Sequence, residues 1–183
     1  ITTDSSDDIY VTRLTSGGFG GKTSSGGQDI FLVKYNSSGT KQWTKQLGTS
    51  SDDEGYGVIT DSSDNIYVTG RTSGGLDGNT SSGGHDIFLV KFNSSGTKQW
   101  TKQLGTSSYD YGSGVTTDSS DNIYVTGRTS GGLDGNTSSG GHDIFLVKYN
   151  SSGIKQWTTL LETSSYEGYD GVRSYSSDHI LCC

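Results

Sequence analysis

The chain repeats its own sequence every 57 residues. The octapeptide "DIFLVKYN" at Asp29 returns at Asp86 and at Asp143, with Phe in place of Tyr in the middle copy. Residues 61–91 and 118–148 are identical. Self-similarity at a fixed period indicates one supersecondary unit that is stacked several times, each copy burying the faces of its neighbours. The period divides the 183 residues into three complete units, 1–56, 57–113 and 114–170, and the start of a fourth, 171–183.

Each unit contains four expected β-strands, joined by turns rich in Ser, Asn, Asp and Gly. In the middle unit these strands cover Gly57–Asp61, Ile66–Thr72, Asp86–Asn93 and Lys98–Thr106, and a polar loop of 13 residues precedes the third strand. Short turns of this composition join antiparallel strands. The chain has 29 Gly and no Ala, so the residue with the highest helix propensity is missing. We therefore expect an all-β fold.

The third strand of each unit is apolar on both of its faces. A sheet with one solvated face alternates apolar and polar residues, but this strand contains an uninterrupted Ile-Phe-Leu-Val run. Four-stranded antiparallel sheets that stack face to face around an axis are the blades of a β-propeller. The prediction is a β-propeller with three full 57-residue blades and the start of a fourth. Lys98 and Lys102 place charge on the fourth strand, as suits the unpaired outer edge of a blade.

The strand order and the turn residues resemble the bacterial β-propeller repeat called the SBBP repeat. The resemblance is carried by "GVTTDSSDNIYVTG" at Gly114–Gly127, by "HDIFLVKYNSSG" at His142–Gly153 and by Trp157, and it covers the chain three times. It implies propeller blades on exported or cell-surface bacterial proteins. The family brings no agreed catalytic residues, so no reaction is implied.

Closure of the ring requires more than three blades. Propellers have about 4 to 8 blades, and three would leave two apolar sheet faces open to water. We expect either further blades of the same protein or self-association, for instance two chains that supply six blades. The first unit has Arg13 and Leu14 where the second has Gly70 and Arg71. Such departures fit either a capping unit or the truncated end of a longer array.

The long loops predict a binding face, because rigid scaffolds present variable loops for binding. Connections from second to third strands and from one blade to the next emerge on the same side of the ring. We expect a protein or glycan ligand there. The candidate residues are Asp77, Asn79, His85, Asp86, Tyr109, Asp110, Tyr111, Asp134, Asn136, His142 and Asp143. The tyrosines of this face, including Tyr166 and Tyr169, either form an aromatic binding surface or fill gaps between blades.

Metal binding is a weaker hypothesis for the same loops. The oxygen ligands that Ca²⁺ takes are offered by Asp77, Asn79, Asp86, Asp134, Asn136 and Asp143. Their spacing matches no EF-hand loop, and ordinary turn chemistry explains the same residues. Zinc is disfavoured because His85 and His142 supply one imidazole per blade, whereas zinc needs three or four converging ligands. The expectation is no cofactor, with Ca²⁺ as the alternative.

The tryptophans at 43, 100 and 157 recur in the fourth strand, where packing between blades is expected and sugar stacking is the alternative. The adjacent Cys182 and Cys183 are too close for the usual disulfide span, so free thiols are expected, with pairing to another chain or a soft metal as alternatives.

The net charge of −7 disfavours nucleic acid and anionic membrane surfaces as partners. No apolar stretch approaches the roughly 20 residues of a membrane span. Catalysis is not expected, because the sequence contains no G-x-S-x-G nucleophile elbow, no H-E-x-x-H zinc motif and no glycine-rich phosphate loop. Near-identical units also place the same chemical groups in every blade, whereas an active site needs different groups that converge. The prediction is a non-enzymatic scaffold or binding module, located extracellularly or on a cell surface. The alternatives are the propeller portion of a larger enzyme and a designed or purely structural repeat protein.

Overall fold

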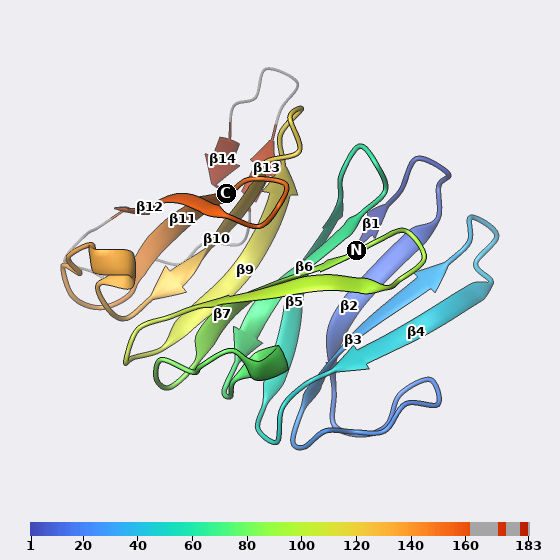
Figure 1. The fold of residues 1–183 in the computed structure, drawn as a ribbon, viewed down its shortest axis with the longest axis horizontal. Coiled ribbons are helices and arrows are strands. Elements are labelled where there is room, and N and C mark those ends of the chain that lie inside the picture. The colour runs from blue at the N-terminus through green and yellow to red at the C-terminus, as the bar shows by residue number, and fades with distance from the viewer. Residues whose placement is uncertain (162–171, 175–179, 183) are drawn as a thin grey trace.

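The computed structural model describes residues 1–161, 172–174 and 180–182, which fold into three four-stranded antiparallel sheets and one two-stranded sheet. Figure 1 shows the three larger sheets side by side, from the blue and cyan sheet near the N-terminus to the yellow and orange one. Within the described residues they form an open array and no closed ring. The all-β prediction of a partial propeller with four-stranded blades is confirmed.

Each sheet is one blade, and its strands lie in chain order. Blade 1 consists of β1 (Thr2–Thr3), β2 (Ile9–Thr15), β3 (Asp29–Tyr35) and β4 (Lys41–Leu47). Blade 2 consists of β5 (Asp53–Thr60), β6 (Ile66–Thr72), β7 (Asp86–Phe92) and β8 (Lys98–Leu104). Blade 3 consists of β9 (Asp110–Thr117), β10 (Ile123–Thr129), β11 (Asp143–Tyr149) and β12 (Lys155–Leu161). The two-stranded sheet pairs β13 (Val172–Ser174) with β14 (Ile180–Cys182).

The first strand of blade 2 begins earlier than the sequence pattern suggested. β5 starts at Asp53, whereas the expected strand started at Gly57. A β-bulge between Gly55 and Gly57 shifts the register against β6, and pairing continues beyond it to Asp53. A bulge disrupts the alternation on which strand prediction depends, so the glycine-rich half of the strand resembled a loop.

The turn between the first two strands of each blade is organised by one aspartate. In blade 2, Asp61 accepts hydrogen bonds from the backbone N–H of Ser63 (3.0 Å) and Asn65 (2.8 Å) and from the hydroxyl of Tyr67 (2.9 Å). Tyr10 donates to Asp4 (2.8 Å) and Tyr124 to Asp118 (3.0 Å) in the same way. The repeated Asp-Ser-Ser-Asp segment is therefore an Asx-type turn that is tied to the following strand.

Hydrogen bonds between these turns also join neighbouring blades. The hydroxyl of Ser5 donates to the carboxylate of Asp64 (2.7 Å), and the hydroxyl of Ser62 donates to that of Asp121 (2.9 Å). Each pair joins two successive blades at the same repeat position. These hydrogen bonds between blades therefore recur with the 57-residue period.

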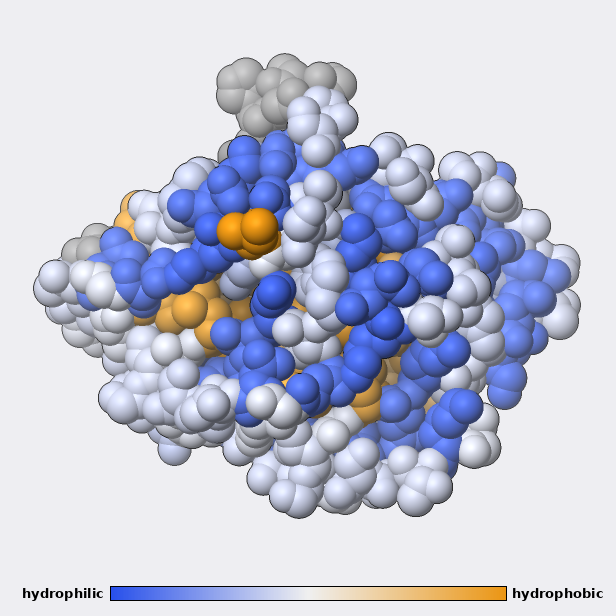
Figure 2. All heavy atoms as spheres, in the orientation of Figure 1, coloured by the Kyte–Doolittle hydropathy of each residue, from blue (hydrophilic) through white to orange (hydrophobic). Residues whose placement is uncertain are grey.

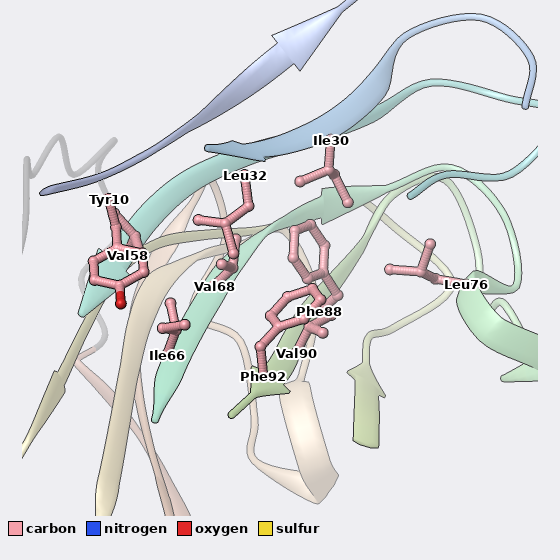
Figure 3. Close-up of a cluster of buried hydrophobic side chains, with 10 residues drawn as sticks. All are labelled: Tyr10, Ile30, Leu32, Val58, Ile66, Val68, Leu76, Phe88, Val90 and Phe92. Atoms are coloured by element: carbon pink, nitrogen blue, oxygen red, sulfur yellow. The ribbon is translucent and has the colours of Figure 1, made fainter. Parts of the chain in front are cut away.

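The hydrophobic core lies between the blades. One cluster joins blade 1 to blade 2, and Figure 3 shows its ten side chains converging from both sheets. A second cluster joins blade 2 to blade 3. In β7 the five residues from Asp86 to Val90 are all buried, because Phe88 and Val90 face blade 1 while Ile87 and Leu89 face blade 3. Packing on both faces is thus confirmed for the third strand of blade 2.

The third strands of the two outer blades differ from this expectation. β11 alternates between buried and partly exposed residues, and Phe31 in β3 is only partly buried. The reason is that each of these blades has a complete neighbouring blade on one side only in the described part of the chain. The sequence of the strand suits two neighbours, and the structure provides two only for β7.

Two of the three repeated tryptophans pack between blades, as the packing interpretation predicted. Trp43 packs against the first core cluster and Trp100 against the second. A Cβ at Gly96 would lie 3.0 Å from the ring of Trp43, so the turn of blade 2 rests on blade 1. Trp157 in blade 3 remains 43% exposed.

The visible surface is polar. Figure 2 shows a face that is mainly hydrophilic, with small and separate hydrophobic areas. Neither helical segment described, η1 (Leu76–Gly78) or η2 (Leu133–Gly135), has the length and apolar character to cross a bilayer.

Candidate functional site

The long loops of blade 2 and the connection to blade 3 meet at a seam between the two blades. The backbone N–H of Gly84 donates to the carbonyl of Ser108 (3.0 Å), and that of Asp110 donates to the carbonyl of His85 (2.9 Å). The N–H of Ser130 then donates to the carbonyl of Tyr109 (3.0 Å). These bonds confirm that both kinds of connection lie on the same face and hold His85 beside Tyr109.

Six side chains converge at this seam and are called the seam cluster: Glu54, Arg71, His85, Tyr109, Tyr111 and Arg128. They come from β5, β6, the loop before β7, the start of β9, and β10. Residues about 75 positions apart in the sequence are thereby neighbours. Rigid strands position all of the cluster except His85 and Tyr109.

Arg71 is the polar centre of the cluster. Its guanidinium forms an ion pair with Glu54 and donates a hydrogen bond to Nε2 of His85. The hydroxyl of Tyr56 donates to the second carboxylate oxygen of Glu54. Burial alone would raise the pKa of Glu54, but the hydrogen bonds from Arg71 and Tyr56 hold it below its usual value. The carboxylate is therefore a fixed anion that orients the arginine.

His85 is held as a neutral ring. Burial lowers its pKa, and the positive charge of Arg71 lowers it further. Because Nε2 accepts the hydrogen bond from Arg71, Nδ1 carries the proton and donates to the hydroxyl of Ser73 (2.8 Å). The ring is thus fixed in one tautomer.

Aromatic rings complete the surface of the cluster. The ring of His85 lies 5.1 Å from that of Tyr109 and 5.4 Å from that of Tyr111, both edge to face. The guanidinium of Arg128 stacks over Tyr111 at 4.6 Å, and that of Arg71 lies 5.5 Å from the same ring. Tyr109 is 52% exposed and faces solvent, whereas Tyr111 is partly buried.

Blade 3 repeats part of this arrangement. The hydroxyl of Ser130 lies 2.7 Å from Nδ1 of His142, as Ser73 does from His85. The position of Glu54 is occupied by Tyr111 one period later, and blade 1 has Leu14 at the position of Arg71. The combination of Glu54 and Arg71 at these two repeat positions therefore occurs in blade 2 and in neither of the other two described blades.

The predicted aspartates at the strand starts are wholly buried. Asp86, Asp110 and Asp143 are each 0% exposed. Asp86 accepts hydrogen bonds from the backbone N–H of Ser82 (2.8 Å) and from the side chain of Gln103 (2.7 Å), so it organises the loop from within. Direct contact with a ligand on the loop face would require these carboxylates to be exposed.

Asp53 and Asp110 occupy equivalent positions at the starts of β5 and β9. Thr106 donates its backbone N–H (2.6 Å) and its hydroxyl (2.9 Å) to Asp110, which also accepts from Thr129. Burial raises the pKa of both Asp53 and Asp110 in spite of such hydrogen bonds. The carboxylate of a neighbouring strand, Asp29 or Asp86, contributes to the increase.

The other predicted residues lie apart from the seam. Asp77 pairs with Lys98 and accepts from Thr101, while Asn79 donates to the carbonyl of Leu76 (2.7 Å). Asp134 and Asn136 repeat these contacts in blade 3, where the hydrogen bond from Lys155 holds the pKa of Asp134 below its usual value although burial raises it. These residues fix the 3₁₀ turns η1 and η2 against the outer strands.

The proposed calcium ligands do not converge in the part of the chain that the structure describes. No group of three or more His, Cys, Asp or Glu side chains there is arranged to hold a metal ion. Asp77 is engaged by a lysine at the outer strand, whereas Asp86 is buried beneath the loop. Tyr166, Tyr169 and Cys183 lie outside the described residues.

Sequence reasoning identified three members of the seam cluster and missed the other three. His85, Tyr109 and Tyr111 were candidates, whereas Glu54, Arg71 and Arg128 were not. A signal was present, because Arg71 and Arg128 are single charges in otherwise uncharged strands at the same repeat position. The pairing with Glu54 depends on the bulged part of β5, which the strand pattern did not reveal.

Three stacked four-stranded blades with their long loops on one face define an open β-propeller array. Residues 42–77 and 99–134 match the family model described as the SBBP beta-propeller repeat, and the two matches start one 57-residue period apart. Two repeats of the chain therefore match this family of beta-propeller repeats.

Two curated proteins are similar over most of the chain. An uncharacterized WD repeat-containing protein of Acanthamoeba polyphaga mimivirus is 30% identical over 214 residues, covering 97% of this chain and 15% of that protein. The regulatory protein FlaEY of Caulobacter vibrioides is 28% identical over 165 residues, covering 81% of this chain and 17% of that protein. The chain therefore spans less than a fifth of the length of either relative.

Proposed function

We propose that the chain is a non-enzymatic β-propeller scaffold that binds a protein or glycan through the seam cluster. The observation that carries this proposal is the exposed ring of Tyr109, which packs against His85, a ring that is itself held by Arg71 and its partner Glu54. Tyr and Arg are enriched where proteins bind partners, because each combines apolar contact area with directional hydrogen bonding. The rigid strands beneath them lower the entropic cost of binding.

The repeat architecture supports binding rather than catalysis. Similarity to a WD repeat-containing protein and to a regulatory protein is consistent with a scaffold. The internal hydrogen bonds of His85 and Arg71 also occupy the groups that acid-base chemistry would use. The alternatives are the propeller portion of a larger enzyme, since the relatives are much longer, and a purely structural or designed repeat protein.

The array extends beyond blade 3 in this proposal. The strand β13 lies against β9 and begins the next sheet. Completion by further blades or by self-association fits the open arrangement, and we place the protein outside the cell or on its surface. No cofactor is included in the proposal, and a melting temperature that rises with millimolar Ca²⁺ would contradict that part.

The test is a glycan array and a panel of surface proteins, probed with the whole chain. Tyr109→Ala removes the exposed ring and is expected to weaken any detected binding about tenfold or more. The matched control is Ile154→Ala, since Ile154 is 61% exposed in a turn of the opposite face. Equal binding by both variants and the wild type would place the ligand elsewhere.

A hydrolase and lyase panel, run beside the binding screen, addresses the enzyme alternative. Turnover that survives in the purified chain would overturn the non-enzymatic assignment. Loss of turnover on mutating Arg71 would also move the seam cluster from binding to catalysis.

A further inference from the structure

Five asparagines of the chain stand in the pattern Asn-x-Ser/Thr, which is the acceptor sequence for N-glycosylation. Three of them begin the turn between the third and fourth strands of a blade, and two directly follow the 3₁₀ turns η1 and η2. The first group is Asn36, Asn93 and Asn150, and the second is Asn79 and Asn136. The sequence pattern does not separate the two groups, but the hydrogen bonds of their side chains do.

The turn after β7 leaves the amide nitrogen of Asn93 open. The side-chain oxygen of Asn93 accepts hydrogen bonds from the backbone N–H of Thr97 (2.8 Å) and from the hydroxyl of Ser95 (2.7 Å). Because a backbone N–H can only donate, the bond from Thr97 fixes which end of the amide is the oxygen. Nδ2 of Asn93 donates to no group in the part of the chain that the structure describes. The atom that a sugar would modify is therefore free, and the hydroxyl that the acceptor pattern requires contacts the same amide.

This turn faces solvent although blade 2 has a neighbouring blade on each side. Ser94 and Ser95 are exposed, and Asn93 is partly exposed. Gly96 is buried, and its Cβ position lies 3.0 Å from the ring of Trp43 in blade 1. The turn thus rests on blade 1 through its glycine and presents its serines to solvent.

Asn79 has a similar exposure but a different arrangement of hydrogen bonds. It is partly exposed, as Asn93 is. Its Nδ2 donates to the backbone carbonyl of Leu76 (2.7 Å). The hydroxyl of Ser81, two residues later, donates to the carbonyl of Gly83 (3.3 Å) and not to the amide. An enzyme would have to break the bond to Leu76 before it could turn this amide toward a sugar.

Both arrangements recur with the 57-residue period. The side-chain oxygen of Asn36 accepts the same two hydrogen bonds (2.8 and 2.7 Å), and that of Asn150 accepts one from the backbone N–H four residues later (2.9 Å). Nδ2 of Asn136 donates to the carbonyl of Leu133 (2.8 Å), as that of Asn79 does to Leu76. The position within the blade therefore decides whether the amide nitrogen is free or bonded.

We propose that Asn93 is an N-glycosylation site and that Asn79 is not modified in the folded chain. The same assignment extends to their repeats, with Asn36 and Asn150 as acceptors and Asn136 unmodified. The proposal rests on the extracellular location proposed above, since this acceptor pattern is used in surface loops of secreted proteins.

The donor in this reaction is a sugar that is activated as a diphosphate ester. The bond between C1 of the sugar and the phosphate oxygen breaks, and a bond between C1 and Nδ2 of the asparagine forms. The diphosphate leaves with the bonding electron pair, and one amide proton passes to a base of the transferring enzyme.

A glycan on Asn93 would lie at the end of β7 that is opposite to the seam cluster. The loop that contains His85 enters this strand at Asp86, and the turn leaves it after Phe92. The strand has seven residues and therefore spans roughly 20 Å. Modification of the turn would leave the seam cluster accessible to a ligand.

The experiment uses the purified whole chain and a soluble glycosyltransferase that transfers glucose from UDP-glucose to Asn-x-Ser/Thr. Peptide mass spectrometry gives the rate of modification at each asparagine. Each rate is divided by that of a synthetic peptide of residues 89–97 or 75–83, which removes the effect of local sequence. We expect the normalised rate at Asn93 to exceed that at Asn79 by about fivefold or more, because only Asn79 must first lose a hydrogen bond.

Asn93→Gln is the matched variant, since it keeps an amide but removes the acceptor pattern. It should lose modification of this turn and leave the rate at Asn79 unchanged. Circular dichroism before and after the reaction verifies that the chain is folded.

Equal normalised rates at Asn93 and Asn79, or a faster rate at Asn79, would overturn the proposal. So would an unmodified Asn93 in the folded chain under conditions in which its peptide is modified. The transfer is measured without any ligand of the seam cluster, so this result and that of the ligand screen can fail independently.

Discussion

One phenylalanine occurs at the same repeat position in all three blades, but its environment in blade 1 differs from that in blades 2 and 3. Phe88 and Phe145 are 1% and 0% exposed because each ring packs against the preceding blade. Phe31 lies on the outer face of blade 1, where its main aromatic neighbour is Phe19 at 4.8 Å, and it is partly exposed. Replacement by alanine therefore measures how much stability the neighbouring blade contributes.

Truncation of a fully buried Phe costs about 3–5 kcal/mol, since the transfer free energy is lost and a cavity remains. We expect this range for Phe88→Ala and Phe145→Ala. For Phe31→Ala we expect about 1–2 kcal/mol, because only part of the ring leaves water on folding and solvent can fill the space. Strand propensity cancels, since residue type and position in the repeat are the same at all three sites.

Urea unfolding of the three variants, followed by far-UV circular dichroism and tryptophan fluorescence, gives the three free energies. Equal losses at Phe31 and Phe88 would refute the reasoning, because the neighbouring blade would then contribute nothing. A larger loss at Phe31 would refute it as well.

Two further predictions follow from glycine packing and from the buried carboxyl groups. Gly127→Ala should destabilise the chain by about 1–3 kcal/mol, because the new Cβ clashes with the neighbouring strand. Gly17→Ala is the control: the space around its Cβ position is open, so stability should change by about 0.5 kcal/mol or less. Equal melting temperatures of the two variants would show that the clash is absent. Because burial raises the pKa of Asp110, the folded state binds its proton more tightly than the unfolded state does. The free energy of unfolding that this proton contributes is fully present below the unfolded pKa of about 3.9 and is lost as the pH rises through the folded pKa. Relative to the wild type, Asp110→Asn should therefore gain stability as the pH rises through that window, and parallel urea midpoints for the two proteins from pH 4 to 7 would contradict this.

The sequence predicted the architecture because the repeat makes every local signal appear three times. The apolar run after Asp86 requires cover on both faces, and β7 has it. The Asp-Ser-Ser-Asp turns and the lysines of the fourth strand are local features. Their positions could therefore be predicted without knowing which blades pack together. Register was harder, because the bulge at Gly55 breaks the alternation of β5.

The site was less predictable because it depends on contacts between side chains that are distant in the sequence. The sequence placed His85 and Tyr109 on one face. It could not show that Arg71, which precedes His85 by 14 residues, would donate a hydrogen bond to its ring. Asp77 and Asp86 look equivalent as oxygen ligands in a loop, yet one pairs with Lys98 and the other is buried. Burial and partner choice are properties of the folded array, not of the loop composition.

The central claim is that the third strand of blade 2 is covered on both faces by neighbouring blades. The most direct measurement is the effect of a soluble paramagnetic agent on methyl NMR signals of the whole chain. We predict almost no relaxation enhancement for Leu89 and Val90, which face blade 3 and blade 1, and a strong one for Ile154, which is 61% exposed. Enhancement of either Leu89 or Val90 to the level of Ile154 would contradict the account.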